Sequence, residues 1–240
     1  MVDLLDLAVT AHGGMERWRR LSRFRAVASI RGAIWALKGQ AGLLDDVLIE
    51  GETRDQRVKL SPFPGPGEYA TWEPHRQTIE TTDGVLVTER LDPGSAFDGH
   101  TRETQWDHLH AAYFAGEASW NYFVAPFVFT RPDFRTEELE PWAEGGEVWR
   151  RLLVSYPDTI VAHHRQQTYY FDEPGLLRRI DYAVDILGGG PAVHYPSAYN
   201  DFDGIVLPTR RRVYVRNPDD GTPILDAVSV AIDLKQASFD

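Results

Sequence analysis

The chain has 240 residues and a net charge of −11, with 36 acidic against 25 basic side chains, which disfavours nucleic acid and anionic lipid surfaces as partners. It has no cysteine, which excludes disulfides, thiolate metal sites and a cysteine nucleophile. Hydrophobic residues make up 42% and aromatic residues 12%, more aromatic area than a lean sheet core requires, so we expect a single globular domain, residues 1–240, that houses something apolar.

The N-terminal part has apolar residues at helical spacing. They recur from Asp3 to Ala11, and His12-Gly13-Gly14 ends the helix because glycine tolerates a left-handed backbone. A second short helix is predicted from Met15 to Leu21. The chain opens without a basic segment or a long apolar run, and no window approaches eighteen apolar residues. We therefore expect no secretory signal, no stable membrane insertion and a cytoplasmic location.

From Phe24 the pattern changes to short strands. They are predicted at residues 24–37, 45–52, 54–61, 68–74, 76–82 and 85–91. Asp83-Gly84 between the last two runs is a strong hairpin signal. The polar, turn-rich residues 92–106 that follow are predicted to form a loop.

The β pattern returns in the C-terminal half, at residues 147–157, 166–172, 176–184, 192–199, 209–216 and 224–234. The connections are too short for crossover helices, so the sheet should be antiparallel. About ten strands in sequence must close or curl around something. We therefore predict a mainly β (α+β) fold, a curved antiparallel sheet or half-barrel with N-terminal helices and a central helix that covers the concave face.

Residues 106–124 form the predicted central helix, which Pro126 closes because the residue before a proline is disfavoured in the α region. Its small and apolar face is suited to packing on the sheet, and comprises Leu109, Ala112, Gly116, Ser119 and Phe123. A second face carries polar and aromatic groups that could contact a ligand, namely Trp106, His110, Tyr113, Glu117, Trp120 and Asn121.

Asp107 precedes His110 by three residues, so its carboxylate could hold one imidazole nitrogen and leave the other free as a general acid or base. Tyr113 could donate to the same ligand atom, and His194 and Tyr169 could face this helix from late strands. A packing role for these side chains is the alternative. In the basic run, Arg211 points away from Arg210 and Arg212, and a solvated strand face is expected there.

No bound metal or cofactor is expected. His108 and His110 diverge on a helix, and His163 and His164 must split across a strand, so metal ligands could converge only through the tertiary fold. No Gly-x-Ser-x-Gly elbow occurs, and the GGGP at 188–191 leads into a strand, which makes it a poor phosphate cradle.

Two short motifs carry a family resemblance. The first is AHGGMERWRRLSRFRAVASIRG, in which a helix end leads through a short helix to a long strand. The second is the hairpin YYFDEPGLLRRIDY. In these two segments the sequence resembles the lipoprotein-carrier half-barrel family, the LolA and LppX-like proteins. Trp106, Asp107, Leu109 and His110 also resemble the Trp-Asp-x-Leu-His segment of uncharacterised bacterial proteins. The resemblance implies an open, curved antiparallel sheet with an apolar cavity for a lipid-like ligand.

Three classes of function remain open. The first is a binder of a hydrophobic, polycyclic or lipid-like small molecule in the cup between sheet and helix. The second is a cofactor-independent cyclase, isomerase or hydrolase with acid and base residues in the same cup, for which His110, Asp107, Tyr113 and His194 are the candidates. The third is a structural or partner-binding protein with a filled core. A homodimer is compatible with each of them.

Overall fold

The computed structural model describes residues 2–240, and its strands form one antiparallel sheet of 14 members. The predicted mainly β fold is confirmed, with more strands than the expected ten. The strands are β1 Arg23–Arg31, β2 Leu44–Glu52, β3 Val58–Ser61, β4 Glu68–Glu73, β5 Arg76–Thr81, β6 Leu86–Leu91, β7 Arg135–Glu144, β8 Glu147–Ser155, β9 Gln166–Phe171, β10 Leu177–Val184, β11 Gly190–Phe202, β12 Ile205–Arg216, β13 Pro223–Ile224 and β14 Val230–Phe239.

The sheet joins two meanders through its last strand. Its order is β6-β5-β4-β3-β2-β1-β14-β12-β11-β10-β9-β8-β7, with β13 paired to β12. β14 therefore lies between β1 and β12, and Phe239 near the C-terminus pairs with Phe24 near the start of β1. Each meander pairs strands that follow one another in the chain, as the short Gly-, Pro- and Asp-containing connections predict.

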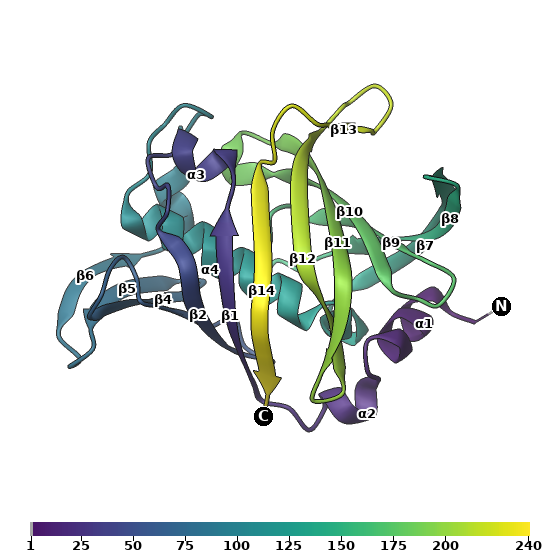
Figure 1. The fold of residues 1–240 in the computed structure, drawn as a ribbon, viewed down its shortest axis with the longest axis horizontal. Coiled ribbons are helices and arrows are strands. Elements are labelled where there is room, and N and C mark those ends of the chain that lie inside the picture. The colour runs from purple at the N-terminus through teal and green to yellow at the C-terminus, as the bar shows by residue number, and fades with distance from the viewer. Residues whose placement is uncertain (1) are drawn as a thin grey trace.

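The long helix α4, His108–Val124, lies against one face of this sheet. Figure 1 shows the sheet bending away on both sides of β1, β14 and β12, with α4 running behind these central strands. The helix packs most closely on β3 and β4. A Cβ added at Gly116 would lie 2.7 Å from Cβ of Trp72 on β4, so glycine allows the close approach. The predicted packing role of Gly116 is thereby confirmed.

The N-terminal helices are α1, Leu4–Ala11, and α2, Met15–Trp18. Oδ1 of Asp3 caps α1 by accepting from the backbone N–H groups of Leu5 and Asp6. α2 ends three residues before the predicted Leu21. The Trp18 ring stacks on Phe127 with 4.3 Å between ring centroids, which holds this helix against the segment after α4.

The predicted strand 24–37 is wrong beyond Arg31. Gly32 has a φ of +125°, and a Cβ there would lie 2.4 Å from the carbonyl oxygen of Ser229, so the strand breaks at this residue. The next residues form the short helix α3, Ala33–Leu37. A short apolar run such as AIWAL has no periodicity that separates a helix from a strand.

Strand β7 was not predicted, because its sequence, RTEELEPWAE, is mostly polar and most of its side chains are exposed. It is an edge strand and gains its place by pairing with β8. The predicted strand 224–234 is divided between β13 and β14. The loop predicted at 92–106 contains one short 3₁₀ turn, η1 (Pro93–Phe97), and two further turns are η2 (Phe127–Thr130) and η3 (Asp185–Leu187). Among residues 2–240, no helix is both long enough and apolar enough to cross a membrane.

Candidate functional site

A cavity of about 600 Å³ lies between α4 and the central strands of the sheet. Three of its lining residues, Ala33, Arg102 and Val215, are exposed, so the cavity reaches the surface near α3 and the end of β12. Its wall is mostly aliphatic and aromatic. The strand side chains that line it include Ile30 of β1, Tyr182 and Val184 of β10, Ala192 of β11, Val213 of β12, and Val230 and Ile232 of β14.

A third face of α4, neither of the two predicted faces, contributes most of the helix side of the cavity. Its residues are Phe114, Ala115, Ala118 and Tyr122, and Ser119 of the predicted packing face joins them at the cavity. Their spacing of four residues, 114, 118 and 122, follows one stripe of the helix. Small side chains at 115, 118 and 119 leave the space that the cavity occupies, and the aromatic rings of Phe114 and Tyr122 bound it.

Polar side chains gather behind the wall at Tyr122. Its hydroxyl lies 3.1 Å from the Tyr182 hydroxyl and 3.3 Å from Nε2 of His163. Burial raises the pKa of Tyr122 to about 12 and holds the pKa of Tyr182 well above its ordinary value. Both phenols therefore stay protonated at neutral pH and act as neutral donors and acceptors of hydrogen bonds.

Glu117 completes this polar group. Its Oε2 lies 2.6 Å from Nδ1 of His163, although the ring N–H does not point straight at it. Nδ2 of Asn121 donates to Oε1 of Glu117 at 3.1 Å and to the carbonyl of Val161 at 3.0 Å. The predicted ligand contacts Glu117 and Asn121 are thus buried behind the wall, and neither lines the main cavity within residues 2–240.

The predicted acid-base group lies at the start of α4, away from the cavity. Asp107 is the N-cap of the helix: its Oδ1 accepts from the His110 backbone N–H at 2.9 Å, and Oδ2 pairs with Arg90 at 2.6 Å. His110 was expected to keep one ring nitrogen free. Instead Nδ1 lies 2.7 Å from Asp107 Oδ1, and Nε2 lies 3.1 Å from the carbonyl oxygen of Ala96.

The aromatic residues of the predicted ligand face also have protein partners. Tyr113 packs edge-on against Trp72 and beside Phe97, and burial raises its pKa. The ring of Trp106 lies 5.3 Å from that of Phe114. Nε1 of Trp120 donates to the Glu52 carbonyl at 2.8 Å. Trp106, Tyr113 and Trp120 are not among the described residues that line the main cavity.

Tyr169 and His194, predicted to face the helix from late strands, are both buried. The Tyr169 hydroxyl lies 2.6 Å from that of Tyr156, and Tyr169 lines a small cavity beside Arg211. His194 lies edge-on to the Tyr122 ring at 4.8 Å, and burial holds its pKa well below the ordinary value. The structure therefore brings these two residues to the polar group behind the main cavity.

Sequence reasoning missed Tyr122, His163, Tyr182 and Arg211. Arg211 was correctly predicted to point away from Arg210 and Arg212, yet its face is the buried inner one and not a solvated one. The sequence feature that could have identified Tyr122 is its spacing of four residues from Ala118 and of eight from Phe114, which places the three on one side of the helix. No group of three or more His, Asp or Glu side chains placed to hold a metal ion occurs among residues 2–240.

Comparisons with known proteins rest on the fold. No protein-family model matches the sequence, and no curated protein matches it significantly. A LolA superfamily protein from Nitrosomonas europaea superposes with a TM-score of 0.52 and 10% identity, covering 98% of this chain and 90% of that one. A DUF1329 family protein from Desulfovibrio piger gives a TM-score of 0.53 and 13% identity, with coverages of 99% and 92%.

A third solved structure, a domain assigned to sorting of outer membrane lipoproteins in Vibrio parahaemolyticus, gives a TM-score of 0.50 and 9% identity, with coverages of 98% and 92%. In each case the match spans nearly the whole of both chains, so it includes both meanders and α4. The resemblance inferred from the AHGG and YYFDEPG segments is confirmed at the level of architecture: the chain has a LolA-like fold.

Proposed function

We propose that the protein binds a hydrophobic, lipid-like small molecule in the cavity between α4 and the sheet. The observation that carries this proposal is the cavity of about 600 Å³, open at the surface near α3 and lined mainly by apolar side chains. Its volume falls within the range of small-molecule sites, roughly 300–1,000 Å³. Apolar ligand surface buried there is stabilised by about 25 cal/mol per Å².

The comparisons support this class of ligand. One structural neighbour is described as an outer membrane lipoprotein-sorting protein domain. Because only 9% of the residues are identical, the likeness to this neighbour is one of architecture. The small residues at 115, 118 and 119 of α4 keep the cavity open in this chain.

Dye uptake tests the proposal. A neutral, environment-sensitive dye such as Nile red should fluoresce strongly with the wild-type protein. Ala118→Trp places an indole on the cavity wall and should remove most of this signal while circular dichroism shows an unchanged fold. Ala36→Trp, on the exposed side of α3, is the matched control and should behave as the wild type. Equal uptake by the Ala118→Trp protein would contradict a ligand site in this cavity.

A cofactor-independent acid-base enzyme in the same cavity is the second candidate. It is favoured by one observation, the chain of contacts from Glu117 through His163 to the Tyr122 hydroxyl at the wall. If this chain moves protons, Tyr122→Phe should lower turnover of a bound substrate roughly 100-fold or more, the usual scale of acid-base help. A binder should instead keep its ligand chemically unchanged after prolonged incubation, with either residue at position 122.

A further inference from the structure

Arg211 is a buried cation for which the described residues supply no carboxylate. Its side chain is enclosed by the fold, with 7% of the residue exposed, and it takes part in no ion pair among residues 2–240. Nη1 lies 3.4 Å from Nε2 of His194, and Nη2 lies 3.3 Å from the Tyr122 carbonyl oxygen. These contacts use two of the five N–H donors of a guanidinium and leave three without a protein acceptor.

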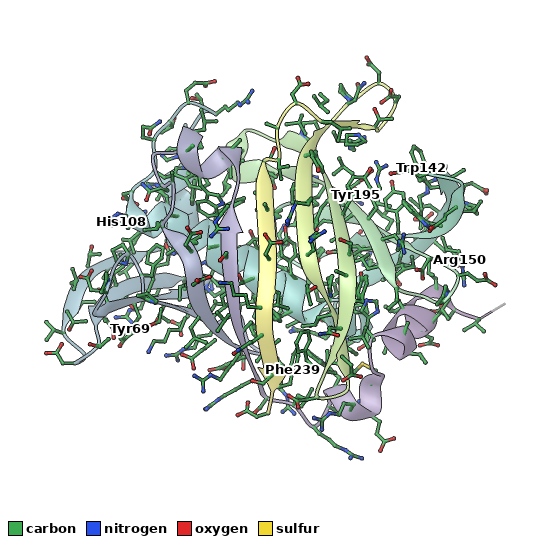
Figure 2. The ribbon with its side chains drawn as sticks, in the orientation of Figure 1. Tyr69, His108, Trp142, Arg150, Tyr195 and Phe239 are labelled. Atoms are coloured by element: carbon green, nitrogen blue, oxygen red, sulfur yellow. The ribbon has the colours of Figure 1, made fainter. Side chains whose placement is uncertain are left out.

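Arg179 shows how the same fold neutralises a buried arginine. It is 1% exposed, and its Nε and Nη2 donate to the two carboxylate oxygens of Asp181 at 2.7 and 2.9 Å. Nη1 donates to Glu144, and Nη2 also donates to the Gly221 carbonyl. This group belongs to the outer face of the sheet, where Figure 2 labels the neighbouring Trp142 and Tyr195. Arg211, on the inner face, has the burial of Arg179 without its counterions.

The unpaired guanidinium adjoins the main cavity. Arg211 lines a small cavity of about 30 Å³, and this space shares the lining residues Ile30, Ser119, Tyr122 and Ile232 with the main one. A water-sized group needs roughly 10–15 Å³ by this measure, so the small cavity has room for about two oxygens. A ligand whose chain occupies the main cavity can therefore present a carboxylate to Arg211 beside Tyr122.

The titratable groups around Arg211 do not neutralise it. Burial holds the pKa of His194 well below its ordinary value, so this imidazole is uncharged at neutral pH. Burial also raises the pKa of Tyr169 and of Tyr199, so they carry no negative charge. The buried carboxylate of this region, Glu117, is paired with His163. The net charge of −11 arises mainly on the surface, where salt screens it within about 10 Å.

We propose that Arg211 binds the carboxylate of the ligand, which makes the ligand a long-chain carboxylic acid that enters head first. This inference rests on the proposed function and adds the class of molecule to it. The chain of the acid lies against Ala118 and Val213, and its head forms charge-assisted hydrogen bonds with the free guanidinium donors. The small volume beside Arg211 favours the two oxygens of a carboxylate over a phosphate.

Displacement of Nile red by hexadecanoate and by hexadecanol at pH 8 separates the contribution of the carboxylate head to the affinity from that of the alkyl chain. Wild-type protein should bind the acid about 10-fold or more tightly than the alcohol, the scale of a hydrogen-bonded charge. Arg211→Met should abolish this preference while alcohol binding stays the same or improves. Arg210→Met removes the same charge from an exposed neighbouring position and should keep the preference.

The outcomes test the carboxylate site at Arg211 and the apolar binding function of the cavity separately. Equal affinities of the wild type for acid and alcohol, or a preference that survives Arg211→Met, would overturn the carboxylate site and leave the apolar binding function standing. Failure of the wild type to bind dye, acid or alcohol would overturn the binding function itself. The unfolding midpoint of Arg211→Met is a second readout: it should not fall, because an unpaired buried charge is replaced by an apolar side chain of similar length.

Discussion

Oε2 of Glu117 and Nδ1 of His163 lie 2.6 Å apart in the interior of the protein, with side chains 2% and 4% exposed. Glu117 belongs to α4, and His163 belongs to the connection between β8 and β9. The pair therefore ties the central helix to the second meander, just behind the cavity wall at Tyr122.

Removal of His163 should destabilise the protein strongly. His163→Leu leaves a buried carboxylate without its partner, and we expect the free energy of unfolding to fall by about 3 kcal/mol or more in chemical denaturation. Glu117→Leu should cost less, because it removes the buried carboxylate together with the penalty of keeping it out of water. His164→Ala is the control: its exposed contact with Asp185 should contribute about 0–1 kcal/mol. Equal stabilities for the variants at positions 163 and 164 would contradict a stabilising role of the pair.

Gly116→Ala and Ala118→Gly on α4 should both destabilise the protein, for different physical reasons. Gly116→Ala gains about 1 kcal/mol of helix propensity but forces a methyl group against Trp72, which costs about 1–3 kcal/mol, so a net loss of stability is expected. Ala118→Gly, on the cavity face, should lose about 1 kcal/mol from propensity alone. Urea unfolding of both variants measures the two losses. A stabilising Gly116→Ala would show that α4 can move away from β4 at little cost.

His110 should matter to the start of α4 more than to the ligand. Its side chain and that of Asp107 form a capping box, and its ring packs 4.8 Å from that of Phe97. His110→Ala should therefore lower stability by about 1–2 kcal/mol and leave Nile red uptake by the folded protein unchanged. Thermal unfolding and dye titration on the same samples separate the effects. Loss of uptake at unchanged stability would instead place His110 in ligand handling.

Acidification should destabilise the fold between about pH 6.5 and pH 4. Burial lowers the pKa of His12 from 6.5 to about 4, against the hydrogen bond of its Nδ1 to the Ala8 carbonyl. In this window the unfolded chain binds a proton that the folded chain does not, so stability is complete above pH 6.5 and is lost as pH falls. The full shift of the His12 pKa corresponds to a change of about 3 kcal/mol in the free energy of unfolding.

The variant His12→Asn tests this assignment. Stability measured against pH should fall less steeply for His12→Asn than for the wild type, whereas His75→Asn, at an exposed position, should keep the wild-type slope. His194 contributes in the same direction, because burial also lowers its pKa, so a residual slope is expected in the His12 variant. Parallel curves for wild type and His12→Asn would refute the assignment of the slope to His12.

Local chemistry in the sequence determined most of the architecture. Alternating side chains and short Gly-, Pro- and Asp-containing connections were enough to predict an antiparallel mainly β sheet. Pro126 correctly closed the central helix, because proline geometry acts within a few residues, whereas the helix begins at His108 after the N-cap Asp107, two residues later than the predicted start at Trp106. Strand β7 escaped prediction, since an exposed polar edge strand lacks the hydrophobic alternation that marks its neighbours.

Only the tertiary structure decided which face of α4 lines the cavity. Most side chains of this helix are buried, on every side, so its sequence lacks the single apolar stripe that would indicate one packing direction. The close approach of Gly116 to Trp72 fixes the rotation and turns Ala118 and Tyr122 toward the sheet. The burial of Arg211 has the same origin: alternation along β12 set it opposite Arg210 and Arg212, but the curvature of the sheet around α4 made that side the interior.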